Sequence, residues 1–243
     1  MFTMDALQTF SNLFLATLKE GDYVGFTFFI GSMAMLASTV FFFVQMTNVQ
    51  GKWKDSMLIS GMITGIAAVH YFYMRGFWAE NGTSPTSFRY IDWILTVPLM
   101  CVEFYLILKA FGATVSLLWK MIAYSLLMLI AGYLGETIYR DQSVLWGFIS
   151  TIGYVGILYE VWMGSAKKLA GNSNDPALQK AFGSLGWFVL VGWAIYPIGY
   201  MTIEGGWLDG TLPTESLDII YNIGDAVNKI GFGLVIYTLA VSK

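Results

Sequence analysis

Residues 216–241 read SLDIIYNIGDAVNKIGFGLVIYTLAV, an apolar run with a few polar groups. It is long enough to cross a bilayer, which takes about 20 residues of helix. It is mostly apolar, yet Lys229 lies near its middle, where the side chain is too short to reach either membrane interface. A charge at that depth costs several kcal/mol unless it is paired, neutralised or chemically altered.

Two interpretations of Lys229 follow from this position. Asp225 lies four residues earlier, one helical turn away, so the two side chains can form a structural ion pair. Alternatively, Lys229 is a lysine held in a dry site for Schiff-base chemistry with a carbonyl compound. The stretch alone leaves both open.

The composition is that of an integral membrane protein. The chain has 243 residues, of which 56% are hydrophobic and 12% charged, whereas soluble proteins carry about 25% charged residues. Its one cysteine, Cys101, excludes an intramolecular disulfide and a cysteine metal cage, and its one histidine, His70, excludes a multi-histidine metal site. We therefore expect no metal centre, and the net charge of −3 gives no reason to expect a nucleic-acid partner.

Seven apolar segments are separated by short connections rich in turn residues. They predict an all-α membrane protein, a seven-transmembrane-helix bundle in one domain over residues 1–243, with a short N-terminal segment at 1–21. The predicted spans are 22–47, 55–78, 88–110, 117–138, 143–165, 180–203 and 215–241.

The lysine and arginine bias predicts the orientation, because cytoplasmic loops carry the excess of these residues. One side of the predicted bundle has eight of them, Lys52, Lys54, Lys109, Lys120, Lys167, Lys168, Lys180 and Lys243, and the other has three, Lys19, Arg75 and Arg140. We therefore expect the C-terminus in the cytoplasm and the N-terminus outside.

A second polar constellation lies in the third segment. At 100° per residue, Asp92, Thr96 and Glu103 share one helix face, and Arg89 lies about one turn further out. The axial rise from Asp92 to Glu103 is about 16 Å, roughly half of the hydrocarbon core. Ionisable residues within spans usually mark an ion or proton pathway. The alternative is a set of interhelical hydrogen bonds that fixes packing.

Other polar and aromatic residues are less informative by themselves. A single histidine such as His70 is more often a packed, hydrogen-bonded core residue than a switch. The aromatic residues Trp193 and Tyr196, next to Pro197, are more often packing groups, although aromatic side chains at one depth can clamp a flat apolar ligand. Asp218 lies near a span end, and we assign Glu136 and Glu160 to interhelical hydrogen bonds or interface positions.

Together these stretches resemble the microbial rhodopsins, and specifically the proteorhodopsins, over nearly the whole chain. The motifs that carry the resemblance are HYFYMRG at 70–76, SPTSFRYIDWILTVPL at 84–99, EFYLIL at 103–108, GWAIYPIGY at 192–200 and YNIGDAVNK at 221–229. The pairing of RYIDW in the third span with DxxxK in the seventh is specific to this family.

The resemblance implies that all-trans retinal is bound covalently to Lys229 as a Schiff base. Asp92 and Asp225 are then the counter-ions of its protonated form, and Arg89 completes that cluster. The positions that match the retinal pocket are Trp93, Met100, Trp193, Tyr196 and Pro197. Met100 stands at the colour-tuning position, where an apolar residue resembles the green-absorbing class.

The implied function is light-driven outward proton transport, so the chain is a transporter and not an enzyme. Asp92 matches the proton acceptor, Glu103 the cytoplasmic proton donor, and Thr96 the middle residue of the family's Asp-Thr-Glu motif. His70 matches the histidine that partners the primary counter-ion. The physics agrees, because a protonated Schiff base is a buried cation that a nearby carboxylate stabilises, while desolvation keeps Glu103 protonated.

The resemblance also suggests partners. Gly147 lines up with a position where xanthorhodopsin-like pumps have a glycine that opens a window for a carotenoid antenna; the alternative is a glycine that serves only helix packing. We further expect a multi-pass protein of the bacterial inner membrane, in contact with the lipid bilayer, that forms a homo-oligomer, a pentamer or hexamer.

Three other functions compete with the proton pump. A photosensor would signal through a transducer, but the Asp92, Thr96 and Glu103 set favours the pump. The same set disfavours sodium pumps, which typically carry Asn-Asp-Gln, and chloride pumps, which replace the acidic acceptor. A transporter without retinal that uses Lys229 and Asp225 as an ion pair is the remaining alternative.

Overall fold

The computed structural model describes residues 19–243, and within them seven helices are long and apolar enough to cross a membrane. The prediction of seven spans is confirmed; of the N-terminal segment predicted at 1–21, residues 1–18 lie outside the described part. The crossings are Tyr23–Gln45, Trp53–Asn81, Thr86–Lys109, Val115–Ile138, Arg140–Asn172, Pro176–Met201 and Thr214–Val241.

Four of the crossings are single α-helices and three are interrupted. The single helices are α2 (Tyr23–Gln45), α3 (Trp53–Asn81), α4 (Thr86–Lys109) and α10 (Thr214–Val241). The interrupted crossings are built from α5 (Val115–Tyr133) with the π-turn η1 (Leu134–Ile138), from η2 (Arg140–Gln142), α6 (Ser143–Trp162) and α7 (Ser165–Asn172), and from α8 (Pro176–Trp187), the π-turn η3 (Phe188–Gly192) and α9 (Ile195–Met201).

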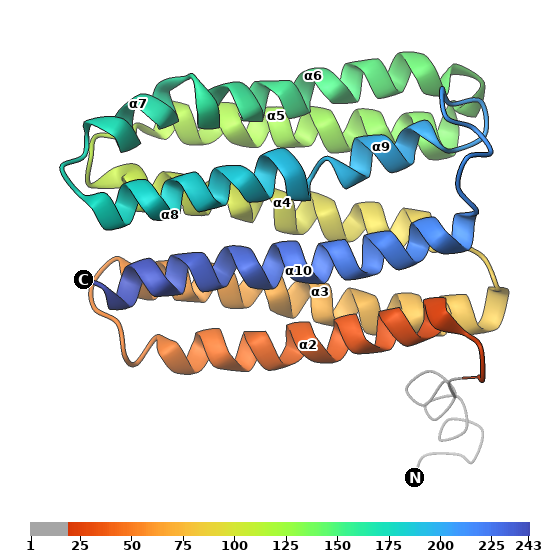
Figure 1. Cartoon of the computed structure of the whole chain (residues 1–243), viewed down its shortest axis with the longest axis horizontal. Coiled ribbons are helices and arrows are strands. Elements are labelled where there is room, and N and C mark those ends of the chain that lie inside the picture. The colour runs from red at the N-terminus through yellow and green to blue at the C-terminus, as the bar shows by residue number, and fades with distance from the viewer. Residues whose placement is uncertain (1–18) are drawn as a thin grey trace, which may run out of the picture.

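The helices form a closed ring. Each crossing packs against its neighbour in the chain, and α10 closes the ring by packing against α2, α3 and α8. Figure 1 shows the crossings running side by side, with the C-terminus at the same end of the bundle as the connection between α2 and α3. Helix α10, which carries Lys229, therefore contacts helices from both halves of the ring.

The outer surface of the bundle is apolar, unlike that of a soluble protein. Large apolar side chains such as Val69, Phe148 and Val227 are more than half exposed. Ionisable side chains are instead buried inside the ring, at 3% exposure or less; they are Arg89, Asp92, Glu103, Glu160, Asp218, Asp225 and Lys229. This pattern fits a bundle whose outer surface meets lipid and whose interior holds the polar groups.

Polar caps fix the ends of several crossings. Asp22 accepts a hydrogen bond from the Gly25 N–H at the start of α2, and Thr114 accepts one from the Leu117 N–H at the start of α5. Helix α3 ends at Gly82, whose φ of 62° lies in the left-handed region that favours glycine. These ends explain why short connections suffice between the spans.

The sixth crossing is interrupted in its middle, which the sequence did not indicate. In η3 the Trp193 N–H donates to the Phe188 carbonyl, five residues back, over 3.0 Å. Such a π-turn frees backbone carbonyls from their usual partners. The Tyr154 hydroxyl of α6 lies 2.9 Å from the carbonyl oxygens of both Val189 and Leu190. A side chain of another helix therefore stabilises the interruption.

The fifth crossing also differs from its predicted end at residue 165. Helix α6 ends at Trp162, and the chain resumes as α7 from Ser165 to Asn172. The Glu160 carboxylate accepts hydrogen bonds from the Ser165 N–H (2.9 Å) and from the Lys120 ammonium (2.8 Å). A buried carboxylate therefore satisfies the start of α7, which is why the helical path continues beyond the apolar segment.

Candidate functional site

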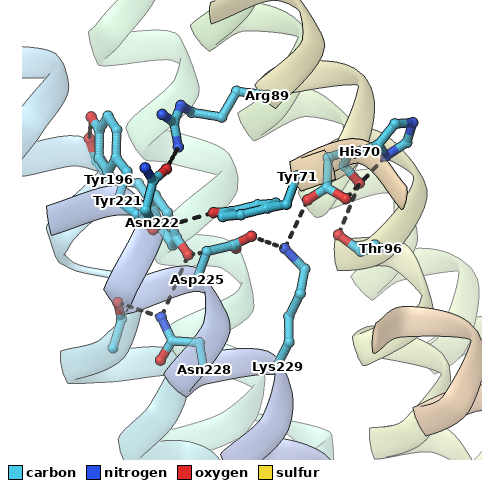
Figure 2. A network of polar contacts seen from close by, with 12 residues as sticks. His70, Tyr71, Arg89, Thr96, Tyr196, Tyr221, Asn222, Asp225, Asn228 and Lys229 are labelled. Carbon is cyan, nitrogen blue, oxygen red and sulfur yellow. Dashed lines mark hydrogen bonds and ion pairs between the residues drawn. The ribbon is translucent and has the colours of Figure 1, made fainter. Parts of the chain in front are cut away.

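The Lys229 ammonium lies inside the ring between two carboxylates. It donates to the Asp92 carboxylate of α4 over 2.8 Å, and it forms a second ion pair with Asp225, one turn earlier on α10. Figure 2 shows the lysine side chain with its amine pointing toward Asp225. All three side chains are buried, so the charges are held by one another and not by water.

Asp92 has a second partner on the other side. Its Oδ1 atom lies 3.1 Å from Nδ1 of His70, on α3, while Oδ2 faces Lys229. The His70 side chain is 22% exposed, so it connects the buried carboxylate with the outer surface of the ring. The Thr96 hydroxyl donates to the backbone carbonyl of Asp92 over 2.9 Å, within its own helix.

Asp225 is held by a tyrosine from the interrupted crossing. The Tyr196 hydroxyl donates to Asp225 Oδ1 over 3.0 Å. Next to it, the Asn228 amide donates to the Gly192 carbonyl over 2.9 Å and approaches the Tyr196 hydroxyl at 3.5 Å (Figure 2). Asn228, directly before Lys229 on α10, is thereby tied to the π-turn η3, and Asp225 is tied to α9.

Arg89 lies at a different level from the Lys229 cluster. It donates to Asp218 Oδ1 over 2.7 Å and to Asn222 Oδ1 over 2.9 Å, and its guanidinium lies 5.3 Å from the ring centres of Phe28 and Tyr221. In Figure 2 it stands beyond Asn222, away from the lysine amine. The direct ion-pair partner of Arg89 is therefore Asp218.

Glu103 lies toward the other end of α4, on the end of the bundle that carries the C-terminus. Its side chain is completely buried, and Oε1 accepts a hydrogen bond from the Ser60 hydroxyl of α3 over 2.9 Å. Among residues 19–243, the Oε2 atom has no hydrogen-bond partner. An unpaired carboxyl oxygen in an apolar surrounding favours the protonated acid over the carboxylate.

An apolar cavity of about 340 Å³ lies beside the cluster of Lys229, Asp92 and Asp225. Its volume is within the range of small-molecule binding sites. Its lining includes Trp93 and Tyr196, whose rings meet edge to face with centres 4.8 Å apart. The other sequence-predicted residues that line it are Trp193, Pro197 and Gly147.

The cavity and the lysine fit a long apolar ligand with one reactive end. Within the described residues, the Trp93 indole N–H is buried without a partner. Tyr196 lines the cavity and donates to Asp225, the partner of Lys229, so it links the cavity to the lysine. Met100 is buried in the core next to the cavity and is not among its lining residues in the described part of the chain.

Comparisons with known proteins agree with this geometry. The model of the family described as bacteriorhodopsin-like protein matches residues 22–243. The green-light absorbing proteorhodopsin of Gamma-proteobacterium EBAC31A08 is 47% identical over 230 residues, which cover 93% of this chain and 90% of the relative. The blue-light absorbing proteorhodopsin of Gamma-proteobacterium Hot 75m4 is also 47% identical, covering 93% and 89%.

The chain belongs to the bacteriorhodopsin-like family.

Solved structures of family members share the fold. The blue light-absorbing proteorhodopsin from Med12 is 44% identical with a TM-score of 0.78, covering 91% of this chain and 99% of that one. Xanthorhodopsin, described as a light-driven ion pump with dual chromophore, is 31% identical with a TM-score of 0.79, covering 93% and 95%. Membership of this rhodopsin family implies a retinal chromophore, and seven spans with bacterial relatives make the chain a multi-pass bacterial plasma-membrane protein.

Sequence reasoning found most of the residues that meet at this rhodopsin site. The structure brings together Lys229, Asp92, Asp225, His70 and Tyr196 in one connected network.

Two residues of the site, Asn228 and Asp218, were given no role from the sequence, and Asp218 was noted only as lying near a span end. Asn228, directly before Lys229, could have been noticed as a polar residue in the middle of a span. Asp218 precedes Asp225 by seven residues, which is two helical turns on one face, and this spacing was its available signal.

Proposed function

We propose that the chain is a light-driven outward proton pump built as one retinal-binding domain over residues 1–243. The observation that carries the proposal is the buried amine of Lys229 held between the carboxylates of Asp92 and Asp225. It is supported by the 47% identity to proteorhodopsins over 93% of the chain. A structural ion pair would need one carboxylate, whereas this site has two.

All-trans retinal is proposed to bind covalently to Lys229 as a Schiff base, with its apolar part in the cavity lined by Trp93, Trp193, Tyr196 and Pro197. When bound, the chromophore absorbs light and changes the direction in which the proton on the lysine nitrogen points. The chain's own residues then decide where that proton goes. Met100, at the colour-tuning position, favours the green-absorbing class.

Asp92 is proposed as the proton acceptor and Asp225 as the second counter-ion. Asp92 is 2.8 Å from the lysine nitrogen, and its other oxygen is held by His70, so it can take a proton without leaving its place. Asp225 is held in place beside the site by the Tyr196 hydroxyl. Thr96 bonds the Asp92 backbone and positions this turn of α4.

Glu103 is proposed as the proton donor on the cytoplasmic side. It lies about 16 Å along α4 from Asp92, three turns away on the same face. Its burial and its unpaired Oε2 atom, within the described residues, favour the protonated acid. A protonated donor toward one end and an ionised acceptor toward the other give the transfer its outward direction.

The test is light-induced pH change in unbuffered cells that express the chain with all-trans retinal. Acidification that a protonophore abolishes is expected. Persistent alkalinisation would contradict outward transport, and a coloured protein without any pH change would favour a photosensor. A colourless protein would leave the retinal-free transporter, in which Lys229 and Asp225 form only an ion pair.

A carotenoid antenna is a second proposed ligand. The cavity passes Gly147 and reaches Phe148 and Trp207, whose side chains are 64% and 73% exposed. A Cβ atom at Gly147 would lie 2.5 Å from the Tyr200 ring, so the glycine allows that ring to line the opening. Xanthorhodopsin, with its dual chromophore, has the same fold.

Excitation transfer tests the antenna. With an added hydroxylated carotenoid, light absorbed by the carotenoid should drive pumping in the wild-type protein. Gly147→Trp should abolish that part of the action spectrum and keep pumping in the retinal band, which also shows that the variant folds. Equal action spectra for the two proteins would end this proposal.

The chain is further proposed to form a pentamer or hexamer. His70 supports this, because its side chain links the buried Asp92 to the outer face of α3, where another copy can pack. Mass measurement of the detergent-solubilised protein with intact lipids is the test. A monomer under conditions that keep the retinal absorption would contradict it.

A further inference from the structure

Asn228 is a buried polar side chain that the pump scheme above does not use; it is 4% exposed and directly precedes Lys229 on α10. We propose that Asn228 is a positioning residue that directs the proton of Lys229 to one of its two carboxylate partners, Asp92. The other partner, Asp225, keeps its negative charge. This inference rests on the proposed function, since it concerns the first proton transfer of that pump. In this step the nitrogen–hydrogen bond at Lys229 breaks, its electron pair stays on the nitrogen, and the proton bonds to an oxygen of Asp92.

Proximity does not choose between the two carboxylates, because the Lys229 nitrogen forms ion pairs with both Asp92 and Asp225. What differs is the second partner of each. The second partner of Asp92 is Nδ1 of His70, which donates or accepts according to its tautomer. The second partner of Asp225 is the Tyr196 hydroxyl, whose single hydrogen can turn toward the carboxylate or away from it. The direction of that hydrogen therefore decides how strongly the charge of Asp225 is stabilised.

Asn228 fixes the direction of this hydrogen. Its amide nitrogen Nδ2 lies 3.5 Å from the Tyr196 hydroxyl oxygen, and an amide nitrogen only donates. The hydroxyl oxygen therefore faces an N–H group on that side, and its own hydrogen is left to point to Asp225 Oδ1, 3.0 Å away. A hydrogen-bond donor to a carboxylate favours the charged form over the acid. Asp225 thus keeps its charge, and the proton goes to Asp92.

The π-turn η3 is what holds the Asn228 amide in this position. In a continuous helix the Gly192 carbonyl would accept from the N–H four residues later, that of Tyr196. That N–H instead donates to the Trp193 carbonyl over 3.1 Å, and the Asn228 amide supplies a donor to Gly192 over 2.9 Å. Since a carbonyl only accepts, this bond also fixes which end of the amide faces η3. A Cβ atom at Gly192 would overlap with Asn228 Oδ1, so the glycine makes the approach possible.

A purely structural Asn228 would satisfy the Gly192 carbonyl and have no effect on proton transfer. The two roles separate when Asp92 can no longer take the proton, because only Asp225 is then left as an acceptor at the lysine. With the amide present, Asp225 should still not accept the proton. Without the amide, the Tyr196 hydroxyl is free to turn away, and Asp225 becomes able to take it.

The test measures deprotonation of Lys229 by flash spectroscopy of the full-length, retinal-loaded protein. Asp92→Asn alone should lose most of the deprotonation, and adding Asn228→Leu should raise its yield again by about tenfold, the effect of one hydrogen bond to a charged group. Tyr196→Phe in place of Asn228→Leu should give the same gain, and the two together no more, since both act through one hydroxyl. Val227→Ala is the matched control, a lipid-facing neighbour that is 57% exposed, and should give no gain in the same background.

Three results would overturn the inference alone. No gain from Asn228→Leu makes the residue structural, and a further gain when Tyr196→Phe is added means that the amide acts by another route. If Asn228→Leu does not bind retinal, Gly192→Ala decides, since its Cβ displaces the amide; a yield there no higher than in Gly183→Ala, at an open site, refutes the inference. Full deprotonation in Asp92→Asn alone would instead refute the acceptor role of Asp92 together with this inference. A wild-type protein without any light-driven deprotonation would refute the pump itself.

Discussion

Lys229 shows what one buried residue demands of its surroundings. Its charge is opposed by Asp92 and Asp225, and the outer pair of Arg89 and Asp218 adds one charge of each sign. Two cations thus face three carboxylates inside the ring. A structural role would need only equal numbers of cations and carboxylates. The third carboxylate, which has no cation of its own, is therefore the feature that favours proton transfer.

The donor role of Glu103 gives a prediction at the residue scale. In Glu103→Gln the return of the proton to Lys229 should slow by about 10²-fold, because one positioned acid is lost. The rate should also fall about tenfold per pH unit as the pH rises, since the proton must then come from water. Flash spectroscopy of the retinal band from pH 5 to 7 measures this, and a roughly flat pH profile over that range is expected for the wild type.

Ser60→Ala is the control for this prediction. It removes the 2.9 Å hydrogen bond to Glu103 but keeps the acid, so its kinetics should change far less than those of Glu103→Gln. If the glutamine variant recovers as fast as the wild type, Glu103 is not the donor.

At the scale of single elements, the π-turn η3 depends on Tyr154. Tyr154→Phe leaves the Val189 and Leu190 carbonyls without the hydroxyl that lies 2.9 Å from both. Unsatisfied buried acceptors cost about 1–3 kcal/mol, so the thermal unfolding midpoint in detergent should fall. Tyr159→Phe, at a lipid-facing position of the same helix, should leave the midpoint unchanged; equal midpoints for both variants would show that η3 does not need the hydroxyl.

The start of α8 gives a pH-dependent prediction. Asp175 accepts hydrogen bonds from the N–H groups of Ala177 and Leu178 and pairs with Lys243 at the end of the chain. The hydrogen bond from Lys243, assisted by these backbone donors, lowers the pKa of Asp175. The ionised form therefore stabilises the fold above the unfolded pKa of about 3.9, and this contribution is lost as the pH falls through the lower folded value.

Asp175→Asn keeps a capping oxygen and removes the charge. Its free energy of unfolding should be lower than that of the wild type by about 0.2–1 kcal/mol between pH 5 and 7, as for an exposed ion pair. The difference should vanish at the acid end of a series of thermal melts. Asp141→Asn, at an exposed site, should show no difference at any pH; a difference for Asp175→Asn that grows in acid would reverse the assigned sign.

These elements show where prediction from sequence stops. Apolar length and turn residues predicted all seven spans, because the bilayer imposes them locally. The π-turn at Phe188–Gly192 depends on Tyr154, 34 residues earlier than Phe188, and the start of α7 depends on the Glu160 carboxylate. Such contacts are not visible in a local pattern. Asp225 was predicted because it precedes Lys229 by one turn, while the pairing of Arg89 with Asp218 was not predicted because it joins two different helices.

At the scale of the whole molecule, the buried ionisable groups lie one after another along the bundle axis, in a file from one end to the other. Glu103 lies toward the end of α4, Lys229 lies in the middle of α10, and Arg89 and Asp218 lie near the starts of α4 and α10. Figure 1 shows that α10 ends where the chain ends, on the side of the connection between α2 and α3. A proton that follows this file moves away from the C-terminus. The direction of transport in the cell therefore depends on which side the C-terminus faces.

The excess of lysine at the C-terminal end predicts that this end is cytoplasmic. The chain offers a direct test, because its one cysteine, Cys101, is fully buried. A single new cysteine at either end can then be labelled with an impermeant maleimide in spheroplasts. Asp209→Cys, in the connection between α9 and α10, should react in intact spheroplasts, and Ser242→Cys should react only after permeabilisation. The wild type is the control and should stay unlabelled. The opposite labelling would mean that the protein has the reverse orientation in the membrane. The same residues would then move protons into the cytoplasm, and the light-induced pH change of the medium would have the opposite sign.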